Sequence, residues 1–259
     1  RGSDGRIRAF YNVCQHRGNR LVTAEVGSLG GGEFQCAYHG WRFADTGRLN
    51  WVYCEEDFPQ GSPCGKRNLV ELPCDTWGGF IWINMDEGCM SLQQYLEPIA
   101  GHLDTYRMEK MKRTHWVTLE GDFNWKCIQD NFNESYHLAF VHPQLGPVMH
   151  EYHTECQFDL YPYADDLVGL RVALQRRKRE LGAAKGYDFS YYSDDQLTDN
   201  YHYTFFPNLS LSMKPDGSIF LMGRPHPTDP EKCLFDMWYL TLFPEGATEY
   251  FANLSLIHI

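Results

Sequence analysis

The sequence predicts an α+β protein with two domains: a small antiparallel β domain, then a larger domain in which one helix packs on a mostly antiparallel sheet. Residues 1–90 are rich in Gly and Cys and contain short strand-like runs between turn residues. After residue 110, one helical segment lies among several strand-like runs. With 259 residues, 43% of them hydrophobic and 15% aromatic, the chain is long and apolar enough for two packed cores.

The elements can be placed in chain order. The first domain, residues 1–90, has strand-like runs at residues 6–13, 32–36 and 79–84. Apolar residues at helical spacing over residues 91–106 predict a linker helix within residues 91–110, which Pro98 kinks or shortens. The second domain, residues 111–259, is predicted to hold a helix within residues 124–142 and strands at residues 112–119, 167–174, 201–206, 209–213, 218–224 and 234–243.

Composition restricts the possible partners and the compartment. A formal net charge of −11 argues against binding to nucleic acid or to an anionic membrane surface. No apolar run approaches the length of a transmembrane helix. The nine cysteines are odd in number and irregularly spaced. Apart from Cys14 and Cys36, which are candidate metal ligands, we expect them to be reduced and mostly structural in a cytoplasmic protein.

Two Cys/His pairs in the first domain have the composition of a metal site. Cys14 and His16 form a C-x-H pair, and Cys36 and His39 form a C-x-x-H pair. Two cysteines and two histidines can hold tetrahedral zinc or a Rieske [2Fe–2S] cluster, in which two His replace two Cys on one iron. Zinc fingers do not mix Cys and His within each pair in this way, which favours the Rieske cluster.

A glycine follows each histidine of these pairs closely. Gly18 comes two residues after His16, and Gly40 directly follows His39. Glycine adopts backbone conformations that other residues avoid, so each loop can fold its main-chain amides over the cysteine sulfur.

A second candidate metal site lies in residues 124–142, NWKCIQDNFNESYHLAFVH. Glu134, His137 and His142 follow the pattern E-x-x-H-x-x-x-x-H. Two histidines with a carboxylate from elsewhere form the facial triad that holds non-haem Fe(II) and leaves positions open for O2 and substrate. The alternative is an ordinary helix with two structural histidines. His137 and His142 lie about 140° apart on an ideal helix, so a shared metal requires the helix to unwind or bulge before Pro143.

These motifs together resemble one protein family. The segments CQHRGNRL, CAYHGWRF followed by Thr46-Gly47-Arg48-Leu49, and NWKCIQDNFNESYHLAFVHP resemble the large (α) subunit of Rieske non-haem iron oxygenases, the ring-hydroxylating and related oxygenases. The resemblance runs from about residue 5 to residue 244. It implies a Rieske domain followed by a helix-grip (START-like) catalytic domain.

The resemblance also implies the roles of individual residues. Ligands of the [2Fe–2S] cluster would be Cys14, His16, Cys36 and His39, and ligands of a mononuclear Fe(II) would be His137 and His142. Glu134 would be a bridging acid that links His137 to a cluster histidine of the neighbouring subunit, in a head-to-tail homotrimer or an α3β3 assembly. Many family members have Asp at this position, and Glu is shared by some that act on quaternary ammonium substrates.

The third iron ligand is not evident from the sequence. The family takes it from an Asp far downstream of the second histidine, where this chain offers Asp229, Glu231, Asp236, Glu245 and Glu249. Asp236 lies in a strand-like run and is expected to be structural. We expect the true ligand to lie beyond the chain end.

The cluster is expected to have a low reduction potential. High-potential Rieske proteins place a disulfide where this chain has Asn19 and Tyr38, and a serine hydroxyl where it has Trp41. Fewer hydrogen bonds to the sulfurs predict a potential of about −150 mV. No G-x-G-x-x-G motif follows a strand, so the electrons are expected from a separate NAD(P)H reductase, with or without a ferredoxin.

Three functions remain open from the sequence. The leading one is a terminal oxygenase that uses O2 and reductase-derived electrons to hydroxylate a small organic, aromatic substrate. The second is a mono-oxygenase acting on a quaternary ammonium or other non-aromatic substrate. The third is a Rieske electron carrier without catalytic iron. Aromatic residues that could line a substrate pocket, or simply pack in the core, are Tyr136, Phe140, Tyr201 and Phe205.

Other features have ordinary alternatives. Four further histidines could be ligands but are more often surface or capped residues: His150, His153, His202 and His226. We expect the fragment to be truncated at both ends, because residues 1–13 lead straight into the first cluster loop. Residues 254–259 follow no strand pattern and match a translated transposon end used in sequencing libraries, so we expect them to be artefactual.

Overall fold

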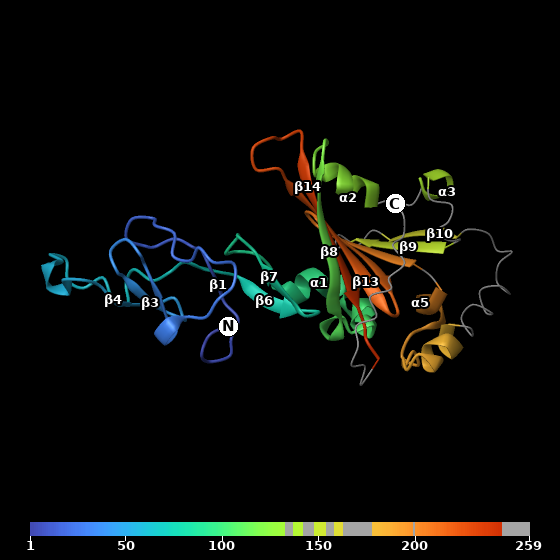
Figure 1. Cartoon of the computed structure of the whole chain (residues 1–259), viewed down its shortest axis with the longest axis horizontal. Coiled ribbons are helices and arrows are strands. Elements are labelled where there is room, and N and C mark those ends of the chain that lie inside the picture. The colour runs from blue at the N-terminus through green and yellow to red at the C-terminus, as the bar shows by residue number, and fades with distance from the viewer. Residues whose placement is uncertain (133–136, 142–147, 154–157, 163–177, 199, 245–259) are drawn as a thin grey trace. The chain divides into compact units, whose positions relative to one another are not determined.

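The computed structural model describes residues 1–132, 137–141, 148–153, 158–162, 178–198 and 200–244 (Figure 1). It divides into two compact units, Arg1–Leu92 and Gln93–Ile259. Short strands form the first unit, and a seven-stranded sheet with helices forms the second. The predicted α+β class is therefore confirmed. Within the described part of the chain, no helix is both long and apolar enough to cross a membrane.

Antiparallel pairs of short strands build the first unit. A three-stranded sheet has the order β2 (Glu33–Gln35), β3 (Arg42–Ala44) and β4 (Leu49–Trp51). The other two sheets have two strands each: β1 (Ala9–Phe10) with β5 (Glu71–Leu72), and β6 (Cys74–Trp77) with β7 (Phe80–Ile83). The 3-10 turn η1 (Gly30–Gly32) directly precedes β2 in the chain, and the 3-10 turn η2 (Glu55–Asp57) follows β4.

The strand predicted over residues 6–13 is shorter in the structure. Only Ala9 and Phe10 are in β1, because the main chain then turns, and Val13 N–H donates to the Tyr11 carbonyl at 2.7 Å. The strands predicted at residues 32–36 and 79–84 are confirmed as β2 and β7.

A small core holds the first unit together. Its buried members include Trp41, Phe43 and Leu49 together with Cys14 and Cys36. The two cysteines are therefore anchored in the core of the unit, at the base of their loops.

One mixed sheet forms the second unit, with strands in the order β10-β9-β11-β12-β13-β14-β8 (Figure 1). The bounds of the strands are β8 Lys112–Gly121, β9 Val148–His153, β10 Phe158–Pro162, β11 Asn200–Phe205, β12 Leu209–Lys214, β13 Gly217–Pro225 and β14 Cys233–Thr241. The five strands predicted within 112–119 and 201–243 are confirmed, whereas the strand predicted at residues 167–174 lies outside the described residues. The expectation of a mostly antiparallel sheet is confirmed, and the one parallel pair among the described strands of this sheet is β9 with β11.

The helices pack on opposite faces of this sheet. Helix α1 (Leu92–Leu103), followed by the 3-10 turns η3 (Asp104–Tyr106) and η4 (Met108–Lys110), confirms the helix predicted near residues 91–106. Its His102 ring contacts Tyr201 and Tyr203 of β11. Helix α2 (Lys126–Phe132) places Phe132 against His202 of the same strand. Because side chains alternate along a strand, α1 and α2 cover different faces.

Asp236 of β14 is held by two neighbouring strands. Thr118 of β8 donates its hydroxyl to Asp236 Oδ1 at 2.6 Å, and Arg224 of β13 donates to both carboxylate oxygens. Burial raises the pKa of Asp236, but the hydrogen bonds from Arg224 and Thr118 outweigh it and hold the pKa below its ordinary value. Both oxygens are occupied, as expected of a structural carboxylate.

Replacing Asp236 with Asn should make the protein less stable at neutral pH, by about 1–3 kcal/mol, because a charge-assisted interaction is lost. Since the pKa of Asp236 is lower in the folded chain than in the unfolded chain, its contribution is complete above about pH 4–5 and is lost as pH falls through the folded pKa. Denaturant unfolding of both proteins across this range should show the difference shrinking in acid. A difference that is independent of pH would contradict the ionised pairing.

Candidate metal sites

Two loops of the first unit repeat one backbone geometry. In each, the Cys N–H donates to the carbonyl five residues later, and the Gly four residues later donates to the Cys carbonyl. The N···O distances are 2.8 and 3.0 Å in the loop of residues 14–19, and 2.9 and 3.0 Å in the loop of residues 36–41. Gly18 and Gly40 have φ values of +71° and +72°, where a side chain would be strained. The predicted glycine requirement therefore has a structural basis in both loops.

The two cysteine sulfurs lie together at the base of the loops. Cys14 and Cys36 are each 2% exposed, and each thiol contributes to the pKa shift of the other. Burial raises the pKa of Cys14. Burial acts in the same direction on Cys36, but its hydrogen-bond donors outweigh it and lower the pKa. A thiolate is the form that binds iron, so the surroundings of Cys36 favour the ligand form.

Main-chain amides supply most of these donors. The main-chain amides of His16 and Arg17 lower the pKa of Cys14, and those of Tyr38 and His39 lower the pKa of Cys36. The Asn19 side chain adds a further donor, with Nδ2 at 3.7 Å from Cys36 Sγ. The sequence indicates Asn19 only as a replacement for a disulfide cysteine and does not predict this contact.

The two histidines form a second pair. The rings of His16 and His39 have centroids 4.6 Å apart, and Trp41 stacks on His16 at 4.7 Å with an interplanar angle of 6°. Burial lowers the pKa of His16, and the nearby His39 and Arg17 lower it further. Both effects favour the neutral imidazole, which is the form that binds a metal.

This arrangement of donors fits a Rieske cluster better than zinc. A [2Fe–2S] Rieske cluster needs two cysteines on one iron and two histidines on the other, and the structure pairs Cys with Cys and His with His. Tetrahedral zinc needs its donors around one ion. Among the residues described, no three His, Cys, Asp or Glu gather into a group that could hold a single metal ion.

Replacing His39 with Cys should leave a cluster bound but lower its reduction potential, because a second thiolate adds negative charge to that iron. The potential can be measured by redox titration of the visible spectrum. Tyr38→Phe is a suitable control, since Tyr38 contacts the His39 ring but offers no ligand in the predicted site. An unchanged potential in the His39→Cys variant would show that His39 is not a ligand.

The second candidate site is only partly described. His137 lies at the start of helix α3 (Leu138–Val141), where its carbonyl accepts hydrogen bonds from Phe140 N at 3.1 Å and Val141 N at 2.9 Å. The helix predicted within residues 124–142 is confirmed over Lys126–Phe132 and Leu138–Val141. Glu134 and His142 lie outside the described residues, so their geometry relative to His137 stays a prediction.

Close packing fixes α2 against the sheet. A Cβ atom added to Gly223 of β13 would lie 2.8 Å from the Trp125 carbonyl oxygen and 3.2 Å from Ile128 Cδ1. The Phe132 ring also packs on Phe235, with centroids 6.2 Å apart. Glycine at position 223 therefore lets the helix that leads toward His137 approach the sheet closely.

Buried polar residues under α2 were missed by the sequence analysis. Gln129 of α2 and Ser210 of β12 are buried and hydrogen-bonded, and His202 is buried rather than at the surface. The sequence pattern that could have indicated them is the alternation of side chains along β11 and β12, which puts polar residues on the buried face under α2.

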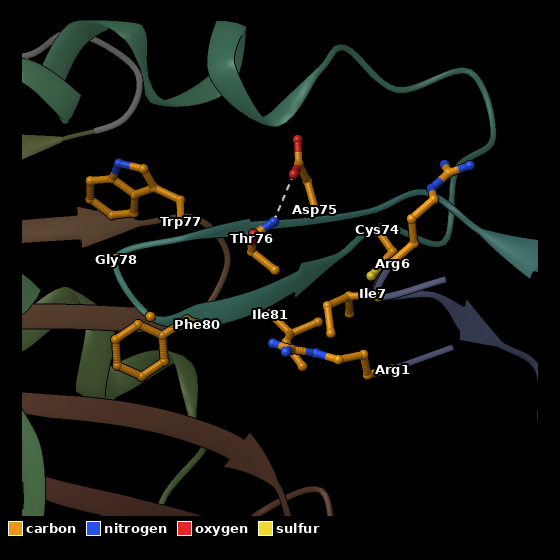
Figure 2. A pocket seen from close by; sticks show the side chains of 12 residues that line it. Arg1, Arg6, Ile7, Cys74, Asp75, Thr76, Trp77, Gly78, Phe80 and Ile81 are labelled. Atoms are coloured by element: carbon orange, nitrogen blue, oxygen red, sulfur yellow. Dashed lines mark hydrogen bonds between the residues drawn. The ribbon is translucent and has the colours of Figure 1, made fainter. Parts of the chain in front are cut away.

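A hollow of about 690 Å³ lies elsewhere in the first unit, between the β6–β7 hairpin and residues 1–7. Figure 2 shows Trp77 and Phe80 near the hairpin turn, and Arg1 and Ile81 among the residues that line the hollow. The Asp75 carboxylate accepts a hydrogen bond from Thr76 N at 2.8 Å. The hollow contains none of the predicted metal ligands, and we assign no function to it.

Comparisons with protein families match both parts of the chain. Residues 1–62 match the Rieske [2Fe-2S] domain, and residues 108–253 match the ring hydroxylating alpha subunit (catalytic domain). The carnitine monooxygenase oxygenase subunit of Acinetobacter pittii is 27% identical over 267 residues, covering 98% of this chain and 66% of that protein. The glycine betaine monooxygenase oxygenase subunit of Pseudomonas aeruginosa is 31% identical over 145 residues, covering 56% and 33%.

Aromatic dioxygenases are similar as well. The large oxygenase component of naphthalene 1,2-dioxygenase from Pseudomonas fluorescens is 37% identical over 153 residues, covering 55% of this chain and 32% of that protein. Among solved structures, a quaternary ammonium Rieske monooxygenase in complex with γ-butyrobetaine has a TM-score of 0.68 at 23% identity, over 96% of this chain and 62% of that one. The chain thus spans about one third to two thirds of the length of these relatives.

Proposed function

Because the chain belongs to the family of ring-hydroxylating α subunits, we propose that the protein is the terminal oxygenase component of a Rieske non-haem iron oxygenase system. In this proposal, residues 1–90 form the Rieske domain, residues 91–110 the linker and residues 111–259 the catalytic domain. The observation that carries the proposal is the pairing of donors in the first unit, Cys with Cys and His with His, in a chain whose second part matches an oxygenase catalytic domain.

The residues of the first unit would hold the cluster in a defined orientation. Cys14 and Cys36 would bind one iron, and His16 and His39 would bind the other. The thiols are buried and receive main-chain hydrogen bonds, which supports their role as thiolate ligands. Stacking of Trp41 on His16 would hold that imidazole in place.

In the second unit, His137 and His142 would bind Fe(II), with Glu134 as the bridging acid toward the cluster of the next subunit in a trimer. When bound, the cluster supplies single electrons and the mononuclear iron activates O2 beside the substrate. The electrons would come from a separate NAD(P)H reductase, directly or through a ferredoxin.

Relatives that act on quaternary ammonium compounds favour that substrate class. The carnitine monooxygenase subunit aligns over 98% of this chain, whereas the naphthalene dioxygenase component aligns over 55%. We therefore place a quaternary ammonium substrate first and an aromatic substrate second, which reverses the order expected from the sequence. The higher local identity of 37% to the naphthalene enzyme keeps the aromatic class as the alternative.

The test is substrate-dependent NADH consumption and product formation by the holoprotein with a surrogate reductase. The panel contains γ-butyrobetaine, carnitine, glycine betaine and naphthalene. The proposal predicts hydroxylated product from at least one of them, and an iron content of three per chain, two in the cluster and one mononuclear. Two irons per chain, with electron transfer but no product, would instead establish an electron carrier.

A further inference from the structure

Three buried side chains form a polar chain beneath α2. Gln129 of α2 is 6% exposed, Ser210 of β12 is fully buried, and Thr204 of β11 is 8% exposed. Ser210 Oγ donates to Gln129 Oε1 at 3.1 Å, and the hydroxyls of Ser210 and Thr204 are 3.5 Å apart. We call these three residues the Gln129 cluster.

Among the described residues, one end of the Gln129 amide has no hydrogen-bond partner. This end is Nε2, which is buried. Turning the amide by 180° would bring Nε2 to Ser210 and leave Oε1 unpaired instead, so one polar end is left over in either orientation. A buried unpaired amide is destabilising, which is why nearly all such groups in native proteins have a partner.

Gln196 is a second buried glutamine, with which the hydrogen bonding of Gln129 can be compared. It is 3% exposed, and both ends of its amide are engaged. Oε1 accepts from Ser193 N at 3.0 Å, and Nε2 donates to Thr105 Oγ1 at 2.6 Å. The unpaired end of Gln129 is therefore not a general feature of the buried glutamines here.

The Gln129 cluster lies on the sheet face that α2 covers. Strand register places Ser210 opposite Leu221, and Leu221 opposite Met237, so that β13 and β14 continue this face with apolar side chains. His202, also on this face, stacks on Phe132 with centroids 5.4 Å apart. The face is thus apolar on one side and polar on the other, with Gln129 eight residues before His137.

We propose that Gln129 is a specificity-determining residue, whose Nε2 donates a hydrogen bond to an oxygen acceptor of the substrate, a carboxylate, carbonyl or hydroxyl group. The inference rests on the proposed oxygenase function and narrows its substrate class. In the orientation that the structure shows, Ser210 donates to Oε1, so Nε2 is the end offered. A site built to hydrogen-bond a substrate group discriminates strongly against the analogue that lacks it, because the site's own polar atom is then left unpaired.

The experiment compares matched ligand pairs that differ only in the oxygen acceptor. One pair is γ-butyrobetaine and butyltrimethylammonium, and the other is 2-naphthoate and naphthalene, so the result does not depend on which scaffold is preferred. Binding of each is measured by calorimetry on the anaerobic holoprotein, and product formation is measured separately. The variants are Gln129→Leu, of similar volume, and Gln129→Glu, of nearly identical shape.

We expect Gln129→Leu to weaken binding of the oxygen-bearing member of the preferred pair about tenfold or more, while the other member binds as in the wild type. Its melting temperature should change little, because removal of the unpaired amide end offsets the loss of the hydrogen bond from Ser210. Gln129→Glu should weaken binding of the carboxylates further, through charge repulsion. The matched control Gln196→Leu should lower the melting temperature and leave the ratio within each pair unchanged.

Two different failures are distinguishable. If the wild type binds and oxidises members of a pair but Gln129→Leu changes the binding of both members equally, Gln129 does not determine specificity. The proposed function then still stands. A large fall in the melting temperature of Gln129→Leu with an unchanged binding ratio would likewise assign Gln129 to the fold alone. If the wild type oxidises no member of either pair and contains only two irons per chain, the proposed function fails and the inference fails with it.

Discussion

Replacing Cys36 with Ser is expected to abolish the visible absorption of the [2Fe–2S] cluster and with it all turnover. Cys36 is buried, Asn19 Nδ2 donates to its sulfur, and the main-chain amides of Tyr38 and His39 lower its pKa. These donors are arranged for a thiolate, and a serine oxygen is a harder and smaller ligand that iron–sulfur clusters rarely use. Iron and acid-labile sulfide content, with the visible spectrum after reconstitution, would measure the loss.

Cys64→Ser is the matched control for this variant. Cys64 is a partly buried residue that packs against the same core as Cys14 and Cys36, but it lies in neither cluster loop. It should keep a full complement of cluster iron and sulfide. A full complement of cluster iron and sulfide in Cys36→Ser would show that Cys36 is not a ligand. Equal losses of iron and sulfide in both variants would indicate damage to the core instead.

The cluster loops could be predicted from sequence because their geometry is local. Each loop is closed by hydrogen bonds within six residues, and the glycine with positive φ is fixed at the fourth position after the cysteine. The contact of Asn19 with Cys36 joins two loops that are 17 residues apart in sequence. No pattern within either loop carries that information.

The sheet was predictable where its strands have a clear sequence pattern. Strand β13 is a short apolar run with buried residues on both faces, bounded by Gly217 and Gly223, and its prediction is confirmed. Strand β9, VMHEYH, mixes His and Glu with apolar residues and lacks a clear period of two, so it was missed along with the neighbouring β10. Its parallel pairing with β11 is a long-range property that a single sequence does not specify.

Alternation also shows which residues share a face but not which helix covers that face. Tyr201 and Phe205 were considered both for a pocket and for the core. They are buried on the face that carries α1, so core packing is the correct alternative for these two. Phe140 is 85% exposed in the described chain, and Tyr136 lies outside the described residues. Ser210 lies on the opposite face, and Gln129 lies in the helix that covers that face. Their contact can be recognised only when the position of α2 on the sheet is known.

Glu134→Gln is the second variant for which we expect a large effect. If Glu134 bridges a cluster histidine of one subunit to His137 of the next, Gln keeps the size but removes the charge that holds both imidazoles in their donor tautomers. Both metals should stay bound, while turnover should fall by about 10–100-fold or more, as expected when a hydrogen-bonding partner of metal ligands is lost. Glu134→Asp should be milder, because it shortens the side chain by one methylene and keeps the charge.

The competing hypothesis makes Glu134 a direct ligand of the mononuclear iron. It predicts that Gln would release that iron, because a neutral amide is a much poorer ligand for Fe(II) than a carboxylate. Iron content, the visible spectrum of the cluster and the product yield of a single turnover, all measured on the holoprotein, separate the two. A bridging Glu134 leaves iron content and spectrum unchanged and lowers the single-turnover yield, since electrons reach the catalytic iron too slowly. Loss of one iron per chain with an intact cluster spectrum would end the bridging hypothesis.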